Sequence, residues 1–494
     1  MRSNTFSDDA TIVAVATPPG KGGVGIIRLS GPQALKIGLR VFRFGDELAE
    51  RKRVESHRMY YGWVCRDAGK RSPHDSTSDI LHSRIDNGYL VYFKAPDSYT
   101  GEDVVELQLH GSPRVLEQVV ALCLHVPPFP SSALRTSSKG GIRLAEPGEF
   151  TRRAFVNGKL DLAQAEAVAD LIEAKTATSA LLASRHLGGE LGTKLLTLRK
   201  RLLALVSLIA GNVNFPEDDL PAVKIRQLQK ELAKIISEIT DLTSNSRYAW
   251  IYRDGLHVAI IGLPNAGKSS LFNALLARDR AIVSEISGTT RDVIEETMDV
   301  QGVPVVLSDT AGITRTDDQL EKMSMERSIK TIRQADMLLL VLDAAKPSAS
   351  GTSFFQALDP AVRALVENKP MMRVYNKLDA TTKYQPRVWK QDEAWVSAKT
   401  GKHIDRLAKQ LVRGYLESGL EQGSLLVTSV RQQHKLDEVK QALLEGLSAL
   451  TSRRELDIIS LDLERAVAAL GEILGIETEE EIVQEIFSRF CIGK

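Results

Sequence analysis

The sequence predicts a multidomain protein of α/β and α structure, in which a doubly wound α/β domain is inserted in a helical domain. Three observations predict this architecture. The chain has 494 residues, which suggests about three domains at roughly 150 residues each. Between residues 255 and 416, short apolar strands alternate with helical stretches, as is typical of a doubly wound parallel sheet. On either side, over residues 160–211 and 425–490, apolar residues recur at helical spacing.

These patterns divide the chain into four segments. We expect an N-terminal α+β domain, the first part of a helical domain, the inserted α/β domain and the second part of the helical domain. Their predicted bounds are residues 1–145, 146–250, 251–417 and 418–494.

The composition excludes several classes of protein. Lys plus Arg is 64 and Asp plus Glu is 63, so the net charge of +1 argues against a polybasic nucleic-acid coat and against an acidic tail. We find no apolar run near the roughly 18 residues that span a bilayer, and we expect no membrane association. Three widely spaced cysteines argue against a disulfide framework and a zinc site. We therefore expect a cytoplasmic protein, or a mitochondrial one if a leader is missing.

In the N-terminal domain, two strands are predicted. One contains Ile26, Ile27 and Leu29, and the other covers residues 104–110. In the second strand, apolar and polar residues alternate, so one face is expected to be buried. Two polar stretches, residues 66–84 and 127–141, are predicted surface loops.

In the rest of the chain, helices and strands are predicted from spacing and from Pro or Gly breaks. Residues 160–211 are predicted to be helical, residues 212–221 to break the helix, and residues 223–245 to form another helix. The predicted strands of the α/β domain are residues 256–262, 303–309, 337–343, 371–376 and 395–397.

Residues 262–269, with the sequence GLPNAGKS, match the phosphate-loop pattern G-x-x-x-x-G-K-[ST]. The match follows an apolar strand and precedes a predicted helix, residues 270–276. Backbone N–H groups and the start of the helix favour bound phosphates. Lys268 is expected to reach the β- and γ-phosphates and Ser269 to bind Mg²⁺.

Three further motifs indicate that the nucleotide is GTP. Asp309 begins DTAG (309–312), which suits an aspartate that acts on Mg²⁺ through water and a glycine N–H that faces the γ-phosphate. NKLD (376–379) places a carboxylate, that of Asp379, where it can accept hydrogen bonds from guanine N1–H and the 2-amino group. Adenine lacks this pair of donors. SAK (397–399) can offer a backbone N–H to guanine O6. All these motifs, in this order, predict a Ras-like GTPase domain.

The predicted switch region is GTTRD (288–292), in which Thr290 would complete the Mg²⁺ shell together with Ser269. Ile313 stands where Ras-like enzymes carry a water-orienting glutamine, so catalysis needs another side chain, a cation or a partner surface. The acidic residues that follow are Asp317, Asp318, Glu321 and Glu326.

The residues predicted to bind GTP come from all of these motifs. They are Asn265, Ala266, Gly267, Lys268, Ser269, Ser270, Ser284, Glu285, Ile286, Ser287, Gly288, Thr289, Thr290, Asp309, Thr310, Ala311, Gly312, Asn376, Lys377, Asp379, Ser397, Ala398 and Lys399.

Together with these motifs, the flanking segments resemble the MnmE (TrmE) family of tRNA-modifying GTPases. The resemblance rests on TPPGKGGVG (17–25), YTGED (99–103), EPGEFT (146–151), NGKLDLAQAEA (157–167) and the final FCIGK (490–494). It covers nearly the whole chain, and the last two motifs are unusually specific.

The resemblance implies a homodimer whose N-terminal domain is folate-binding-like and dimerises, and which forms a heterotetramer with the FAD-dependent partner MnmG (GidA). Together the two proteins would install an aminomethyl-type or carboxymethylaminomethyl group at C5 of the wobble uridine (position 34) of certain tRNAs. A reduced folate, such as 5-formyltetrahydrofolate, would supply the one-carbon unit.

The resemblance also implies particular site residues. A K⁺ ion in the place of an arginine finger would be held by Asn265, Ser284, the Ile286 carbonyl and Thr289, and Glu321 would position the attacking water. The folate would be bound by Arg28, Glu106, Lys159 and Lys494. Cys491 is either a nucleophile near the folate or a small residue packed near the end of the sequence.

Two other functions fit some of the same motifs. One is a ribosome-assembly or signalling GTPase, in which the flanking domains would recruit RNA and should show a basic or aromatic face. The other is a scaffold that binds nucleotide without turnover, which the hydrolysis rate would distinguish.

Overall fold

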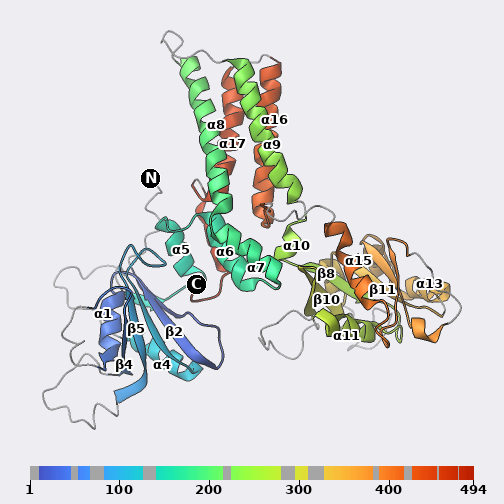
Figure 1. Ribbon diagram of the computed structural model, residues 1–494, viewed down its shortest axis with the longest axis horizontal. Helices are drawn as coiled ribbons and strands as arrows, with labels where there is room; N and C mark the ends of the chain where they lie inside the picture. Colours follow the sequence, from blue (N-terminus) through green and yellow to red (C-terminus); the bar gives the residue numbers. More distant parts are fainter. Residues whose placement is uncertain are drawn as a thin grey trace. The chain divides into compact units, whose positions relative to one another are not determined.

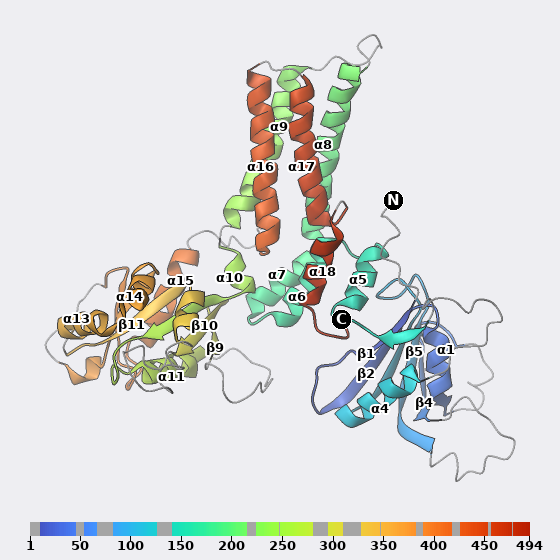
Figure 2. The same cartoon turned by 180° about the vertical axis from the view of Figure 1, so that it is seen from behind.

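The computed structural model describes residues 10–45, 54–66, 83–125, 141–214, 224–246, 248–279, 295–309, 328–345, 347–381, 389–416, 425–452, 456–476 and 478–494 (Figures 1 and 2). The chain divides into two compact units. The first, here called the N-terminal unit, comprises Met1–Ala169 and Gly471–Lys494. The second, here called the central unit, comprises Asp170–Leu470.

The N-terminal unit is built on a seven-stranded sheet with the order β3-β4-β5-β6-β2-β1-β7. Neighbouring strands are antiparallel except for β1 and β7, which are parallel. Helices α1 (Ala34–Val41) and α4 (Pro113–Leu124) contribute to the apolar core on one side of this sheet. The strands are β1 (Thr11–Val15), β2 (Gly22–Ser30), β3 (Phe42–Phe44), β4 (Met59–Cys65), β5 (Arg84–Phe93), β6 (Val104–Gly111) and β7 (Ile142–Leu144).

Both strands predicted in this domain are present, as β2 and β6. The alternation predicted for β6 is confirmed, because Val105, Leu107 and Leu109 are buried while His110 is exposed. Strands β2 and β6 pair in a register that puts Arg28 opposite Glu106. Most of the two predicted polar loops, residues 67–82 and 126–140, lies outside the described residues.

The end of the sequence packs within the N-terminal unit. Helices α5 (Glu149–Val156) and α18 (Glu480–Ser488) are in contact, and Phe155 lies against Phe487. The residues after α18 form a bridge between Ile492 and Pro147, and Figure 2 shows the C-terminus close to α5. Residues far apart in sequence therefore meet at the start of α5.

The central unit contains a bundle of four long helices, which lie side by side in both views (Figures 1 and 2). They are α8 (Glu190–Asn214), α9 (Ile225–Asn245), α16 (Val430–Thr451) and α17 (Leu456–Leu474). The helical stretch predicted before residue 212 is three helices, α6 (Leu162–Glu173), α7 (Ala177–Leu187) and α8. The predicted break at residue 212 was wrong by two residues, since α8 continues to Asn214. In the part of the chain that the structure describes, no helix combines the length and apolar character needed to cross a membrane.

The sheet of the central unit has six strands in the order β13-β12-β11-β8-β10-β9. All neighbours are parallel except β9 and β10. Its strands are β8 (Leu256–Ile261), β9 (Glu295–Val300), β10 (Val303–Asp309), β11 (Met337–Asp343), β12 (Met371–Asn376) and β13 (Glu393–Trp395). Its helices are α10 (Trp250–Arg253), α11 (Lys268–Asp279), α13 (Pro347–Ala357), α14 (Pro360–Glu367), α15 (Ile404–Leu416) and the short 3₁₀ helix η2 (Leu378–Ala380).

The sheet is doubly wound, because helices pack against both of its faces in two separate apolar clusters. Helices α11 and α15 contribute Leu271 and Leu411 to one cluster, and α13 and α14 contribute Phe354 and Val366 to the other. The predictions for β8, β10, β11 and β12 are confirmed. The strand predicted at 395–397 was wrong, because β13 ends at Trp395 and Ser397 instead forms an isolated bridge with Lys402. The sequence analysis missed β9. This edge strand is rich in acidic residues and has few apolar ones, so it does not resemble a buried strand.

Helix α7 is fixed to this sheet within the central unit. The Thr176 hydroxyl donates to the Gly302 carbonyl in the turn between β9 and β10 (2.9 Å). The Ser179 hydroxyl donates to the Tyr252 carbonyl. Leu182 belongs to the larger apolar cluster of the sheet. The β9–β10 hairpin, whose strand β10 ends at Asp309, is thereby held by polar and apolar contacts with α7.

Candidate functional site

The phosphate loop connects β8 to α11, as the sequence predicts, although α11 begins at Lys268 rather than residue 270. The Lys268 ammonium donates to the carbonyls of Gly262 (3.0 Å) and Leu263 (3.2 Å). Burial lowers the pKa of Lys268, and the charge of Asp309 partly opposes this shift. Lys268 is therefore held over the loop, where phosphate oxygens can replace the two carbonyls as its acceptors.

Ser269 and Asp309 lie together at the ends of α11 and β10. The Ser269 hydroxyl donates to Oδ2 of Asp309 at 2.8 Å. The other carboxylate oxygen, Oδ1, is buried and has no hydrogen-bond partner among the described residues. A buried carboxylate oxygen without a donor is costly unless a cation or water satisfies it. The Ser269 hydroxyl and the Asp309 carboxylate are oxygen groups of the kind that Mg²⁺ prefers.

Asn376, which is 2% exposed, connects the phosphate loop to the predicted guanine-binding loops. Its Nδ2 donates to the carbonyls of Ala266 (3.3 Å) and Gly267 (3.4 Å). Its Oδ1 accepts the N–H of Ala398 at 3.0 Å. One amide side chain thus fixes the distance between the part of the site that would hold phosphates and the part that would hold the base.

Asp379 and Ser397 meet where the sequence places the base. The Ser397 hydroxyl donates to Oδ1 of Asp379 at 2.5 Å, and this hydrogen bond lowers the pKa of the Asp379 carboxyl. Asp379 is exposed and ionised at neutral pH. The carboxylate can therefore accept the two donors on the edge of guanine, while Ser397 limits its rotation.

The remaining nucleotide residues are only partly described. Asn265 adopts a left-handed backbone conformation with φ of 63°, and Ser270 lies in the first turn of α11. Other residues that were predicted to bind GTP or K⁺, and the glutamate predicted to position the attacking water, lie outside the described residues. They are Ser284, Glu285, Ile286, Ser287, Gly288, Thr289, Thr290, Thr310, Ala311, Gly312 and Glu321.

In the N-terminal unit, three of the four predicted folate residues come together. Nε of Arg28 pairs with Oε1 of Glu106 at 2.9 Å, and the two side chains are 17% and 13% exposed. The guanidinium also lies 5.7 Å from the centre of the Phe150 ring. Burial lowers the pKa of Lys494, the positive charge of Arg28 adds to this shift, and the charges of Glu106 and Cys491 oppose it. The ammonium of the fourth residue, Lys159, donates to the Pro96 carbonyl at 3.2 Å.

Lys494 reaches this cluster because the final residues of the sequence are tightly docked. Phe150 donates its N–H to the Lys494 carbonyl at 3.1 Å. Gly493 has φ of +99°, and a Cβ atom there would lie 2.1 Å from the Val15 carbonyl oxygen. Only glycine fits this conformation and this approach to β1 without displacement. The residues after α18 therefore form a fixed part of the N-terminal unit.

The three cysteines differ in environment. Cys65 and Cys123 are buried, and burial raises the pKa of both thiols, that of Cys123 to about 12. These two thiols stay protonated at neutral pH, so neither is reactive. Cys491 is exposed, next to the cluster of Arg28, Glu106 and Lys494. Of the two interpretations of Cys491, exposure argues against simple packing.

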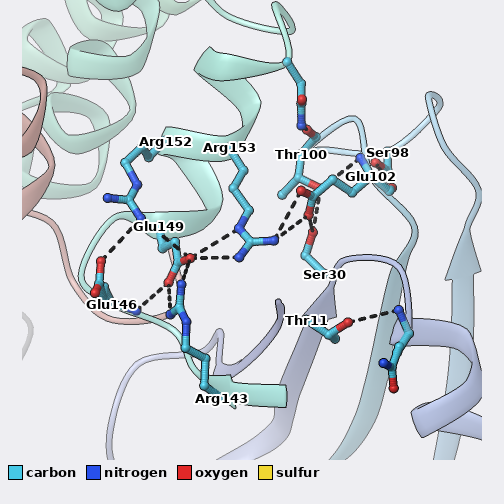
Figure 3. Close-up of polar contacts among 12 residues, drawn as sticks. Thr11, Ser30, Ser98, Thr100, Glu102, Arg143, Glu146, Glu149, Arg152 and Arg153 are labelled. Carbon is cyan, nitrogen blue, oxygen red and sulfur yellow. Dashed lines mark hydrogen bonds and ion pairs between the residues drawn. The ribbon is translucent and has the colours of Figure 1, made fainter. Parts of the chain in front are cut away.

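The sequence analysis missed a network of ion pairs at the start of α5 (Figure 3). Glu149 is fully buried, yet it accepts two hydrogen bonds of 2.7 Å from Arg143 and one of 2.9 Å from Arg153. Arg153 also pairs with Glu102 at 3.1 Å, and Glu102 accepts the Ser30 hydroxyl. Glu102 and Glu149 lie in YTGED and EPGEFT, two of the segments on which the family resemblance rests. Their presence in these motifs was the only sequence feature that pointed to them.

The doubly wound sheet, the phosphate loop and the Asn376–Asp379 segment define a phosphate-loop GTPase. Comparison with protein families gives two matches, to the MnmE helical domain over residues 162–491 and to the TrmE N-terminus over residues 11–159. The chain therefore belongs to the MnmE family of tRNA modification GTPases.

Individual relatives cover almost the full length of the chain. The tRNA modification GTPase MnmE of Aquifex aeolicus is 38% identical, over 98% of this chain and 99% of the relative. Those of Desulforamulus reducens and Legionella pneumophila are also 38% identical, with 98% of this chain and at least 99% of each relative covered. The resemblance inferred from the motifs is confirmed by these matches.

Proposed function

We propose that this protein is a K⁺-dependent GTPase that acts with the FAD-dependent partner MnmG on the wobble uridine of certain tRNAs. The two proteins would add an aminomethyl-type or carboxymethylaminomethyl group at C5 of that base. The observation that carries the proposal is the presence, in one chain, of a guanine-type nucleotide site and the cluster of Arg28, Glu106 and Lys494. A cytoplasmic homodimer that assembles with MnmG as a heterotetramer is part of the same proposal.

In this proposal, different residues of the central unit bind the phosphates, the base and the metal ion of the GTP complex. Lys268 and the N–H groups of the phosphate loop bind the phosphates, and Asp379 selects the base. Ser269 and Thr290 would bind Mg²⁺, and Asp309 would act on the ion through a water molecule. The ion would neutralise charge on the β- and γ-phosphates. Ile313 cannot orient a water, so Glu321 is the proposed positioning residue.

The first test is GTP turnover in KCl and in NaCl at matched ionic strength. We expect turnover to be roughly tenfold faster or more in KCl, because a cation beside the phosphates would replace an arginine finger, which accelerates related enzymes by about 10³–10⁵. Equal rates in the two salts would contradict the K⁺ mechanism. No turnover in either salt would favour the scaffold interpretation.

A variant of Asn265 tests one of the proposed K⁺ ligands. Asn265→Gly retains the left-handed backbone but removes the amide proposed to bind K⁺. We expect this variant to bind GDP like the parent protein and to lose most of the K⁺ acceleration. An unchanged acceleration would remove Asn265 from the proposed K⁺ ligands.

We further propose that the cluster in the N-terminal unit binds a reduced folate such as 5-formyltetrahydrofolate. The Glu106 carboxylate can accept donors from the pterin edge, and Arg28, Lys159 or Lys494 can pair with the glutamyl carboxylates. The close Arg28–Glu106 pair holds both groups at one place on the sheet. Cys491 is exposed beside them and is the candidate nucleophile.

Gly493→Ala is expected to lower the affinity for 5-formyltetrahydrofolate about tenfold, the value of roughly one charge-assisted hydrogen bond. The added Cβ would collide with the Val15 carbonyl oxygen, so Lys494 would leave the cluster. Isothermal titration calorimetry measures the affinity. Hydrogen exchange at the Phe150 amide, whose partner is the Lys494 carbonyl, reports undocking directly.

The matched control is Gly20→Ala. Gly20 also has a positive φ, +121°, but no atom lies within 4 Å of an added Cβ. This variant should carry backbone strain without moving Lys494. If Gly493→Ala undocks the final residues but leaves folate affinity unchanged, Lys494 does not bind the folate.

A further inference from the structure

Asp343 and Lys377 form an ion pair beside the proposed base site. Asp343 is the last residue of β11 and Lys377 directly follows β12. Their charged atoms, Oδ2 and Nζ, lie 3.1 Å apart, and the side chains are 33% and 38% exposed. The two strands are parallel neighbours whose register puts Asp343 opposite Asn376.

Asp343 is itself held in place. Its Oδ1 accepts the N–H of Ala345 at 2.9 Å, and Ala344 donates its N–H to the Asn376 carbonyl at 2.9 Å. The carboxylate therefore has one oxygen committed to its own turn and one facing Lys377. This makes Asp343 a fixed acceptor rather than a mobile surface charge.

Lys377 is unusual in its backbone. Its φ of 65° is left-handed, a conformation that costs energy for a residue with a Cβ atom and that needs support from its surroundings. Lys377 also lies between Asn376, which anchors the phosphate loop, and Leu378–Ala380, the 3₁₀ turn that carries Asp379. A displacement of Lys377 would move both neighbours.

We propose that Asp343 is a positioning residue for guanine nucleotide binding, acting through Lys377. The ion pair holds the long lysine side chain in one direction before the nucleotide arrives, so less side-chain freedom is lost on binding. It also supports the left-handed residue between the phosphate anchor and the base-selecting carboxylate. The inference rests on the proposed guanine-nucleotide site.

The test is the dissociation of a fluorescent GDP analogue from the full-length protein with Asp343→Asn. We expect the dissociation constant to rise about threefold to fivefold, the scale of a partly exposed ion pair. The effect should appear mainly in the dissociation rate. The matched control is Asp392→Asn. This residue forms an ion pair of 2.9 Å with Arg373. Arg373 lies in the first half of β12, whereas Lys377 follows the end of that strand.

A double-mutant cycle with Lys377→Met separates positioning from a general loss of stability. If Asp343 acts through Lys377, adding Asp343→Asn to Lys377→Met costs no further affinity, and the thermal midpoint of the nucleotide-free variants stays close to that of Asp392→Asn. Fully additive effects on affinity, or an Asp343→Asn variant that binds GDP like the parent, would overturn the proposal. A parent protein that binds no guanine nucleotide would instead overturn the proposed function.

Discussion

Glu149→Gln is expected to lower the free energy of unfolding around α5 by about 3 kcal/mol. Glu149 is fully buried and accepts hydrogen bonds from Arg143, Arg153 and the Glu146 N–H. A neutral side chain would leave two arginines without their shared anion, and removing one partner of a buried ion pair costs about 3–5 kcal/mol. This is the largest effect on stability that we expect in the N-terminal unit.

Hydrogen exchange measures this loss locally. The amides of α5 should lose protection by roughly 100-fold, while those of α15 in the central unit should not change. Glu146→Gln is the matched control, because Glu146 lies three residues earlier and pairs with Arg152 at 3.3 Å with its side chain 62% exposed. An exposed pair contributes at most about 1 kcal/mol. Equal effects of the two variants would contradict a stabilising role for the buried network.

The network also predicts how stability depends on pH. Burial alone would raise the pKa of Glu149, but the hydrogen bonds from Arg143, Glu146 and Arg153 outweigh it and lower the pKa below its ordinary value. Such a carboxylate contributes its full stability above the unfolded pKa, about 4.3. The contribution is lost as the pH falls through the lowered pKa of the folded state. The difference between parent and Glu149→Gln should therefore be constant near neutral pH and shrink in acid.

Gly267→Ala is expected to weaken guanine-nucleotide binding about 100-fold. Gly267 has φ of +94°, and an added Cβ would lie 2.4 Å from Nδ2 of Asn376. Left-handed strain costs about 1–2 kcal/mol, and overpacking typically adds about 1–3 kcal/mol. The loop can relax in the free protein, so a cost of about 3 kcal/mol would fall on the nucleotide-bound conformation and corresponds to roughly 100-fold in affinity. The collision would break the hydrogen bonds by which Asn376 holds the phosphate loop.

Titration with a fluorescent GDP analogue measures this affinity. Gly414→Ala is the matched control, because Gly414 lies in α15 and nothing lies within 4 Å of its added Cβ. That variant should bind GDP like the parent protein. If Gly267→Ala also binds GDP normally, the contact between Asn376 and the phosphate loop does not limit nucleotide binding.

Local patterns predicted much of the central unit. Strands β10, β11 and β12 were predicted at their observed bounds, because buried parallel strands are short continuous apolar runs. Asp309 and Asn376 were predicted because each is the last residue of such a strand, Ser269 because it ends the phosphate loop, and Asp379 because it belongs to the same motif as Asn376. The prediction failed at β9, where an edge strand exposes acidic residues, and at Ser397, where the apolar run continues beyond the paired residues.

The sequence by itself determined the order of strands and helices around the phosphate loop, the choice of guanine and the family. These depend on short motifs and on periodicity, which act over a few residues. Only the tertiary structure decided what depends on distant segments. It brought Lys494 to Arg28 and Glu106, assembled Glu102, Arg143, Glu149 and Arg153 into one buried network, and paired Asp343 with Lys377. Apart from the pair of Glu149 and Arg153, which lie one turn apart on α5, these contacts join residues on different elements. Whether two such charges meet depends on how sheets and helices pack, which a local sequence pattern does not reveal.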